Sequence, residues 1–392
     1  MQIESISIKN FRVFQDVVIK NIPSMAVFVG ANGSGKSTLF DVFGFLRDSL
    51  VHNVKSALIN RGGFNEVVSR GSTGPISFEV KFREGSDGPL AVYSLAIGLH
   101  EGLPAVVKEQ LKYRRGQRGQ PWKFLDFKLG EGQAVINESE YGKPAAEMKR
   151  EPQKLESNDI LAIKGLGQFE KFKVVAAFRK LIENWHVSDF HISDARPSQD
   201  AGVAEHLSTR GDNLALAAQH IYENHKDLFA QILEKMKNRV PGVKNVQAVP
   251  TEDGRMVLKF HDGSFKDPFI ARYVSDGTIK MFAYLILLHD PKPYPLLCVE
   301  EPENQLYPQL LSELTEEFRD YARRGGQVFV STHSPEFLNH IKLEEIYWLG
   351  KETGYTKIHN AAGSKLLANL IKEGDTPGTL WKQGLFEWAD PK

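Results

Sequence analysis

The chain has 392 residues, with 49 basic and 49 acidic side chains, 41% hydrophobic residues and one cysteine, Cys298. The balanced charge excludes a general attraction to nucleic acids or anionic membranes, the hydrophobic content excludes wholesale disorder, and the lone cysteine excludes a disulfide framework. Because the sequence has neither a secretory signal pattern nor an apolar run of about 20 residues, we expect a cytoplasmic protein of about two structural units with no membrane partner.

The first expected elements are three strands. Apolar and polar residues alternate around Ile6–Ile8 and Val17–Ile19, and a continuous apolar run follows at Met25–Val29. Alternation is typical of half-buried strands, and a short continuous run is typical of a buried one. We therefore predict two half-buried strands that lead into a buried strand.

The segment Gly30–Thr38 follows the buried strand and matches the full P-loop pattern. Its glycines allow backbone N–H groups to surround phosphate oxygens, and it opens a predicted helix from Lys36 to about Leu50 whose positive end favours an anion. We predict a nucleoside triphosphate site rather than a chance glycine-rich turn, with Lys36 on the β- and γ-phosphates and Ser37 on Mg²⁺. The nucleotide-binding residues expected in this loop are Asn32, Gly33, Ser34, Gly35, Lys36, Ser37 and Thr38.

Shorter elements are expected in the middle of the chain. Strand-like runs at Ile76–Arg83 and Leu90–Leu99 are separated by turn residues, which predicts a hairpin. Apolar residues recur at helical spacing over Gln168–Trp185 and Asp212–Arg239, which predicts a helical lid. Further short strands are expected at Leu111–Arg115, Trp122–Leu129 and Ala134–Ile136, and a loop over Asn137–Asp159.

The densest basic cluster also lies in this middle part. It consists of Lys112, Arg114, Arg115, Arg118 and Lys123, interleaved with Tyr113 and Trp122. Such a mixture suits phosphate contacts and base stacking, so DNA is a candidate partner here. A solvated charged surface is the alternative interpretation.

In the second half, strand-like and helix-like segments alternate, which predicts a mostly parallel sheet. The expected segments are a hairpin that joins Asn245–Val249 and Met256–Phe260, helices at Asp276–His289 and Pro308–Arg324, strands at Leu296–Val299 and Gln327–Ser331, and a helix from Pro335.

Two carboxylates, Glu300 and Glu301, end the apolar run Leu296–Val299. The carboxyl ends of strands in such a sheet face the ligand, so the pair is placed like a Walker B segment. We expect Glu300 to hold the Mg²⁺ shell and Glu301 to polarise the attacking water. Two solvated surface glutamates are the alternative.

Polar residues at the ends of two further apolar segments also point to phosphate. His333 follows the strand after the acidic pair and could donate a hydrogen bond to a γ-phosphate oxygen. Ser275, Asp276 and Gly277 open an apolar helix, where a serine and free N–H groups could hold an anion or could form an ordinary helix cap.

Taken together, the P-loop, the Ser275–Thr278 helix start, the Glu300–Pro302 strand end and the Ser331–Ser334 strand end resemble ABC-type ATPases of the RecF/SMC class. The segment Asn10–Phe14 resembles the N-terminal Asn-Phe-Arg element of that class. The resemblance covers about residues 1–60 and 270–350 and is especially close to short members found beside bacterial DNA-repair and anti-phage defence genes.

The resemblance implies a homodimer that sandwiches two ATP molecules, each held by the P-loop of one protomer and the signature of the other. Ser275 and Gly277 would form the signature, Asn304–Pro308 the D-loop, and Arg12 would lie near the nucleotide. Glu300 departs from the commoner aspartate, and the signature lacks the double glycine of transporters. Gln133 and Gln168 are the candidates for the Q-loop. The region between P-loop and signature is too short and irregular for a condensin-like coiled coil, and no zinc hook or appended TOPRIM nuclease is expected.

We therefore expect an α/β fold of the P-loop ABC-ATPase type, with a mixed sheet core, an N-terminal antiparallel β subdomain and an inserted helical lid. The expected domains are an N-terminal lobe at 1–160, a helical lid at 161–242 and a C-terminal lobe at 243–392. The expected function is an ATPase switch with Lys36, Glu301 and His333 as catalytic residues, which drives a separate effector such as a nuclease in DNA maintenance or phage defence. The alternatives are an ATP-stabilised scaffold with little turnover and the nucleotide-binding subunit of a membrane importer.

Overall fold

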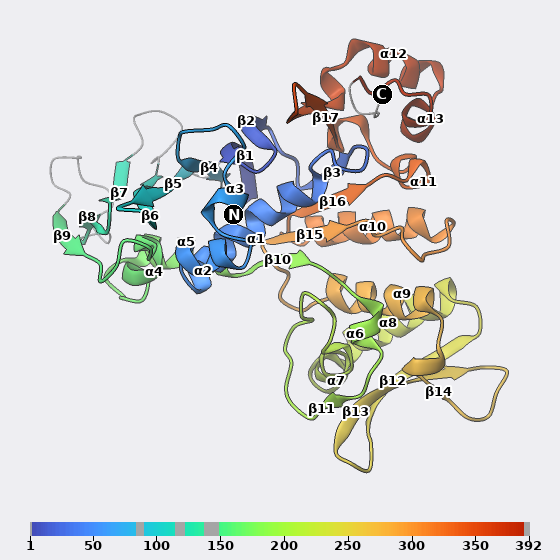
Figure 1. Ribbon diagram of the computed structural model, residues 1–392. Helices are drawn as coiled ribbons and strands as arrows, with labels where there is room; N and C mark the ends of the chain where they lie inside the picture. Colours follow the sequence, from blue (N-terminus) through green and yellow to red (C-terminus); the bar gives the residue numbers. More distant parts are fainter. Residues whose placement is uncertain (1, 84–89, 114–121, 137–148, 388–392) are drawn as a thin grey trace. The chain divides into compact units, whose positions relative to one another are not determined.

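The structure is a computed structural model that describes residues 2–83, 90–113, 122–136 and 149–387 (Figure 1). The chain divides into two compact units. Unit 1 comprises residues 1–185 and 342–392, and unit 2 comprises residues 186–341. Each unit is described separately below. The assignment of an N-terminal lobe to residues 1–160, a helical lid to 161–242 and a C-terminal lobe to 243–392 remains a prediction.

Unit 1 contains an antiparallel sheet of eight strands in the order β2-β1-β4-β5-β6-β7-β8-β9. Every second residue of β4 is buried, as expected for a strand with one face on the core. The sheet confirms the predicted antiparallel β subdomain, and its last strand falls within the segment expected to be a loop. The strands are β1 (Gln2–Phe11), β2 (Phe14–Lys20), β4 (Ile76–Arg83), β5 (Leu90–His100), β6 (Leu103–Tyr113), β7 (Trp122–Lys128), β8 (Glu131–Val135) and β9 (Arg150–Lys154).

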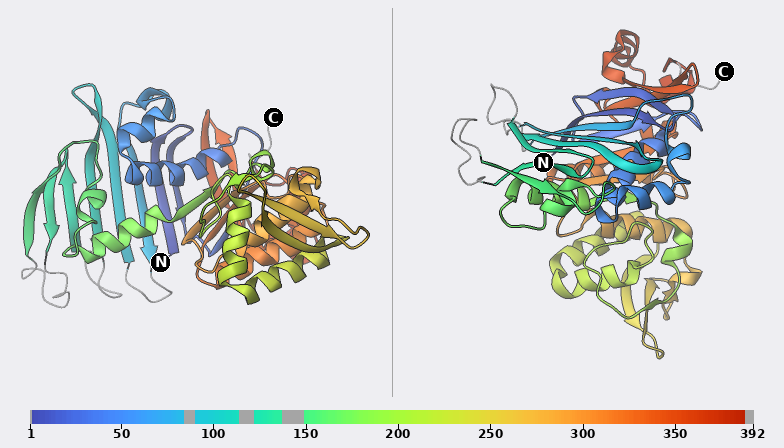
Figure 2. Two further views of the ribbon diagram at one scale, coloured as in Figure 1. Left: turned by 90° about the horizontal axis from the view of Figure 1, so that it is seen from below. Right: turned by 60° about the vertical axis from the view of Figure 1, so that its left-hand side comes forward.

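Helices lie along one face of this sheet (Figure 2). The rings of Phe11, Phe45 and Phe78 join α1 to β1 and β4, with centroid separations of 5.5 to 5.8 Å. Phe178 of α5 meets Phe82 edge-on at 4.9 Å. Such aromatic pairs stabilise the contact beyond the area they bury. The helices are α1 (Lys36–Val51), α2 (Val54–Ile59), α3 (Phe64–Val67), α4 (Ala162–Leu166) and α5 (Lys173–Glu183).

A second group of strands in unit 1 carries the P-loop. The strand β3 (Met25–Val29) is buried at all five residues, and it pairs in parallel with β17 (Ile346–Glu352). An antiparallel partner, β18 (Tyr355–Asn360), extends this pairing. The sequence interpretation assigned no element to this final part of the chain. The remaining elements here are η4 (Leu343–Glu345), η5 (Ala361–Gly363), α12 (Lys365–Glu373) and α13 (Pro377–Lys382).

Unit 2 contains the alternating strands and helices that the sequence predicts. The strands β15 (Leu296–Glu300) and β16 (Val328–Thr332) are parallel, and β10 (Trp185–Ser188) lies beside β15. The helix α9 (Asp276–Leu288) is buried from Thr278 to its end, because it is apolar on almost every side. The other helices of this part are α10 (Leu310–Arg323) and α11 (Pro335–Leu338).

The rest of unit 2 is a helical and β-hairpin region. The predicted helix at Asp212–Arg239 is two helices that meet at His225, α7 (Leu214–Asn224) and α8 (Lys226–Arg239). Glu317 of α10 is buried and pairs with Lys235 and Arg239 of α8, at 2.5 and 2.6 Å. The remaining elements are α6 (Ile192–Ala195), β11 (Gln199–Asp200), β12 (Val243–Pro250), β13 (Arg255–Asp262), β14 (Phe269–Ile270) and η3 (Ala271–Tyr273).

Candidate functional site

The P-loop runs from the end of β3 to the start of α1, and its path depends on glycine. Gly33 and Gly35 have positive φ angles of 77° and 105°. Residues with a Cβ adopt such angles only at a cost in conformational energy. A Cβ on Gly30 would lie 2.4 Å from Ser34 Oγ and 2.8 Å from the carbonyl oxygen of Leu349. The loop sequence therefore specifies a tight turn that other residues would distort.

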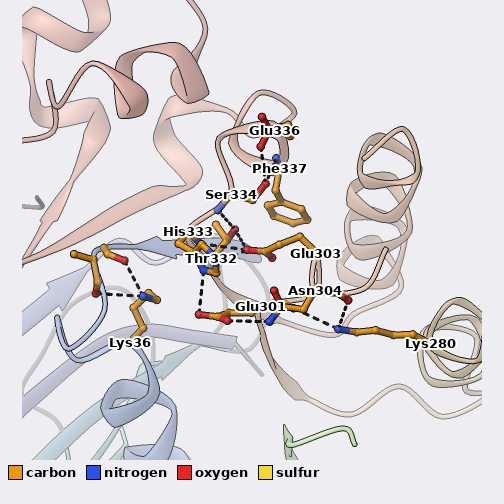
Figure 3. A network of polar contacts seen from close by, with 12 residues as sticks. Lys36, Lys280, Glu301, Glu303, Asn304, Thr332, His333, Ser334, Glu336 and Phe337 are labelled. Carbon is orange, nitrogen blue, oxygen red and sulfur yellow. Dashed lines mark hydrogen bonds and ion pairs between the residues drawn. The ribbon is translucent and has the colours of Figure 1, made fainter. Parts of the chain in front are cut away.

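The groups that this turn gathers fit a phosphate chain. Lys36 is 6% exposed, and its Nζ donates to the carbonyl oxygens of Gly30 at 2.7 Å and Ala31 at 3.3 Å (Figure 3). In the part of the chain that the structure describes, no side chain caps the start of α1 at Gly35. Ser34 Oγ is buried without a hydrogen-bond partner among the described residues. A cation, an uncapped helix start and an unsatisfied hydroxyl within one loop match the needs of bound phosphate.

Arg12, which was expected near the nucleotide, lies in the turn between β1 and β2. Its Nη1 is 2.9 Å from Asp41 Oδ2 of α1, and Arg61 Nε is 2.7 Å from the other oxygen of that carboxylate. The neighbouring Val13 lies against the P-loop, since a Cβ on Gly35 would be 3.0 Å from its side chain. The structure therefore fixes Arg12 on the P-loop helix, through a carboxylate that sequence reasoning did not single out.

In unit 2, the acidic pair stands at the end of β15. Glu300 is the last residue of the strand, and Glu301 follows with a positive φ of 43° and a backbone N–H that donates to Ser331 O at 2.9 Å. One carboxylate oxygen of Glu301 lies 3.1 Å from His333 Nδ1, and the other accepts from Asn304 Nδ2 at 2.9 Å (Figure 3). The structure thus brings together Glu301, His333 and the predicted D-loop. The side chain of Glu301 remains 30% exposed and can meet water.

Glu303 is a site residue that the sequence interpretation missed. Its side chain is 8% exposed, and Oε1 accepts from Thr332 Oγ1 at 2.6 Å and from the backbone N–H of His333 at 3.2 Å. This carboxylate therefore fixes the backbone from which His333 extends. The available signal was a third acidic residue two positions after Glu301.

The predicted signature, Ser275 and Gly277, opens α9. Ser275 Oγ caps the helix by accepting from the N–H of Thr278 at 3.3 Å. A Cβ on Gly277 would lie 2.7 Å from the carbonyl oxygen of Gln305, so the helix start packs closely on the predicted D-loop. The ordinary role of a serine cap is therefore present, and the role in binding a nucleotide remains a prediction.

Lys280 joins the same helix to the acidic segment. Its Nζ donates to Asn304 O at 2.8 Å and lies 3.5 Å from Glu301 O. Burial lowers the pKa of Lys280 to about 8, and the nearby carboxylates of Glu303 and Glu301 oppose this shift. The signature helix and the Glu301 segment are thus linked by an ammonium group in unit 2.

Other predicted positions lie away from these clusters. Gln133 is in β8 and Gln168 follows α4, and both are exposed, so the Q-loop remains unassigned. In the basic cluster, Tyr113 and Trp122 are partly buried and pack against the buried Phe124 and Val135, and DNA binding there remains a prediction. Lys112 and Lys123 pair in register on β6 and β7. Arg114, Arg115 and Arg118 lie outside the described residues.

A P-loop after a buried strand, together with a carboxylate and a histidine at the ends of two parallel strands, defines the class of P-loop ATPases. The chain belongs to the family described as "AAA domain, putative AbiEii toxin, Type IV TA system", whose model matches residues 25–339. This membership confirms the expected ATPase class and supports nucleotide binding.

Two solved structures of SMC heads have a fold similar to that of this chain. A crystal structure of SmcHead bound to the C-winged helix domain of ScpA has a TM-score of 0.53 and 14% identity, and the match covers 92% of this chain and 97% of that one. The Smc head domain with an extended coiled coil, bound to the C-terminal domain of ScpA derived from Pyrococcus furiosus, has a TM-score of 0.50 and 14% identity and covers 95% and 100%. Comparison with curated proteins gives no match. The predicted fold class is confirmed.

None of the helices within the described ranges is long and apolar enough to cross a lipid bilayer.

Proposed function

We propose that this protein hydrolyses ATP and uses the reaction as a dimerisation switch. Two copies would hold two ATP molecules, each between the P-loop of one copy and the Ser275–Gly277 helix start of the other. Hydrolysis would then separate the copies. The family and the P-loop support nucleotide binding. The placement of the signature against the nucleotide of the other copy is our proposal, based on the resemblance to SMC heads.

The observation that carries the proposal is the arrangement around Glu301. A general base must be ionised, correctly aimed and within reach of water. The carboxylate of Glu301 is oriented by its contacts with His333 and Asn304. Its backbone N–H is held by the carbonyl oxygen of Ser331, and about a third of its side chain is exposed. Such a carboxylate can accept a proton from water as the water oxygen bonds to the γ-phosphorus and the bond to the leaving ADP oxygen breaks.

The geometry of His333 indicates how it would contribute. An ionised carboxylate can only accept, so the ring nitrogen that faces Glu301, Nδ1, carries a hydrogen. Only Nε2 remains to contact a γ-phosphate oxygen. We propose this contact as the way in which His333 senses the γ-phosphate.

Oxygen donors for Mg²⁺ are available in both units. Ser37 is exposed in the first turn of α1, and Glu300 ends β15. Hydroxyl and carboxylate oxygens are the ligands that Mg²⁺ prefers. When bound, the ion would neutralise negative charge on the phosphate oxygens. We propose these two residues as its protein contacts, Glu300 through water.

The switch needs an output, and we propose a separate effector protein such as a nuclease, in genome maintenance or phage defence. Two observations support a protein partner. The description of the matched family includes the words "putative AbiEii toxin, Type IV TA system", and two structures of similar fold contain a bound domain of another protein, ScpA. Turnover measured with and without DNA or the candidate effector tests this output, and an unchanged rate with both would contradict it.

Light scattering after gel filtration, combined with phosphate release, tests the switch. With ATP and Mg²⁺ we expect the wild type to hydrolyse ATP and Glu301→Gln to accumulate as a dimer. Ser275→Arg should bind ATP as a monomer, whereas Ser157→Arg, a control at an exposed serine outside the site, should behave as wild type. An ATP-bound Glu301→Gln protein that stays monomeric would refute the switch, and a stable ATP dimer with no wild-type turnover would establish the scaffold instead.

A further inference from the structure

Thr356 reaches the P-loop from the opposite end of the sequence. It lies on β18, is 1% exposed, and its Oγ1 donates to the carbonyl oxygen of Ser34 at 2.7 Å. Its backbone N–H donates to the carbonyl oxygen of Val13 at 2.9 Å. One residue therefore holds both the middle of the P-loop and the turn that carries Arg12.

The hydrogen bond to Ser34 O also determines where an adjacent donor points. In a trans peptide the carbonyl oxygen and the following N–H lie on opposite sides, and the described chain has no cis peptide. Since Ser34 O faces Thr356 on β18, the N–H of Gly35 faces away from β18. That N–H belongs to the residue that opens α1, where an anion is favoured.

The contact around Gly35 leaves little freedom for another arrangement. Gly35 has a φ of 105°, and a Cβ there would lie 3.0 Å from both Thr356 Oγ1 and the Val13 side chain. Gly35, Thr356 and Val13 are thus packed against one another. If the hydroxyl of Thr356 were absent, the carbonyl oxygen of Ser34 would lose its buried hydrogen-bond donor. Rotation of the Ser34–Gly35 peptide toward another donor would also turn the Gly35 N–H out of its present direction.

We propose that Thr356 is a positioning residue for the phosphate-binding loop: its hydroxyl fixes the Ser34–Gly35 peptide so that the Gly35 N–H is available to a nucleotide phosphate. Thr356 itself does not touch the nucleotide. The proposal rests on the proposed function, because it requires that the P-loop binds ATP.

Three variants separate positioning from simple stabilisation of the fold. Thr356→Val keeps the shape and removes the donor, and Thr356→Ser keeps the donor and removes a methyl group. Thr315→Val is the matched control, because Thr315 of α10 is also fully buried and its Oγ1 donates to a backbone carbonyl, that of Leu311, at 2.8 Å. It lies in unit 2, outside the P-loop unit.

Calorimetric titration of the 392-residue chain with ATP and Mg²⁺ gives the dissociation constant. We expect Thr356→Val to raise it about 10-fold, the scale of one lost hydrogen bond, and Thr356→Ser to stay within about 2-fold of wild type. Thr315→Val should lower the melting temperature about as much as Thr356→Val and leave ATP binding unchanged. If Thr356→Val does not fold, Thr356→Cys, with a weaker donor, should give an intermediate dissociation constant.

The proposal is wrong if Thr356→Val binds ATP as tightly as wild type, or if Thr315→Val weakens binding equally. It is also wrong if Thr356→Ser is as weak as Thr356→Val, or if Thr356→Cys, where it is used, binds as wild type. A wild-type protein that binds no ATP gives a different result, because it refutes the proposed function itself, and the inference with it.

Discussion

The candidate site residues form two separate halves, the P-loop of unit 1 and the cluster around Glu301 in unit 2, and these halves are built in different ways. In unit 1, the P-loop consists mainly of backbone, shaped by Gly30, Gly33 and Gly35 and held from outside by Thr356. In unit 2, the cluster around Glu301 consists of side chains joined by hydrogen bonds. A backbone site should therefore be sensitive to changes of shape, and a side-chain site to the loss of one charge or donor. We expect the first half to control binding and the second to control turnover.

The largest expected effect concerns Lys36, the cation of the P-loop. Lys36→Ala removes the cation held at the loop and should weaken ATP binding by more than about 100-fold, since charged contacts to phosphate are strong. Calorimetric titration measures the loss. Lys55→Ala, at an exposed lysine of α2, is the control. Retention of wild-type affinity in Lys36→Ala would remove the distinction between the two halves.

The second prediction concerns turnover alone. Glu301→Gln keeps the shape and the contact to Asn304 but removes the base, so the rate of phosphate release should fall about 100-fold or more while the dissociation constant for ATP stays unchanged. Glu316→Gln, at an exposed glutamate of α10, should retain the wild-type rate. If Glu301→Gln hydrolyses ATP at that rate too, another residue is the base.

A smaller effect is expected at Glu303, which accepts hydrogen bonds from Thr332 and His333 beside Glu301. Glu303→Gln weakens the charged acceptor of Thr332 Oγ1 and of the His333 N–H, so His333 becomes less well placed. We expect kcat to fall about 10-fold, with ATP affinity within 2-fold of wild type, as for a group that acts through others. A large loss of affinity with normal kcat would assign Glu303 to binding instead.

The smallest effect on either half is expected from Glu109, a buried carboxylate of unit 1. It accepts from the N–H groups of Ala162 and Ile163 at 2.5 and 3.1 Å and from Tyr93 Oη at 3.0 Å. Burial nevertheless raises the pKa of Glu109 from 4.5 to about 7, so the folded state binds more protons than the unfolded state between these values. Stability is therefore lost as pH rises through this window, by about 3 kcal/mol at most.

Denaturant unfolding at a series of pH values measures this loss. Glu109→Gln has no proton to lose in this window. The unfolding free energy of the wild type minus that of the variant should therefore decrease from pH 4.5 to pH 7. ATP affinity at pH 8 should be similar in both proteins. A difference that grows with pH would contradict the assigned pKa direction.

The parts of the site that local patterns describe could be predicted from sequence. The buried strand Met25–Val29 and the helix that begins at Lys36 lie where the apolar run and the P-loop place them. The strand before Glu300 and the cap at Ser275 follow the same logic. In each case the residues that determine the structure are neighbours in the chain.

Contacts between distant residues could not be predicted in this way. Ser34 and Thr356 are 322 positions apart, and no local pattern links them. The hairpin that carries Thr356 did leave a signal, an apolar run at Ile346–Leu349 followed by a turn at Thr353-Gly354. The break between α7 and α8 at His225 gave none, because the apolar spacing continues across it.

The parallel pairing of β3 with β17 has a consequence for how the protein is made. A nascent chain that has reached residue 339, where the family match ends, already contains every motif residue of the candidate site. It still lacks the strand that satisfies one edge of β3 and the threonine that orients the Ser34 peptide. During synthesis on the ribosome, β3 and the phosphate loop can therefore gain these two contacts only after residues 346–360 have emerged.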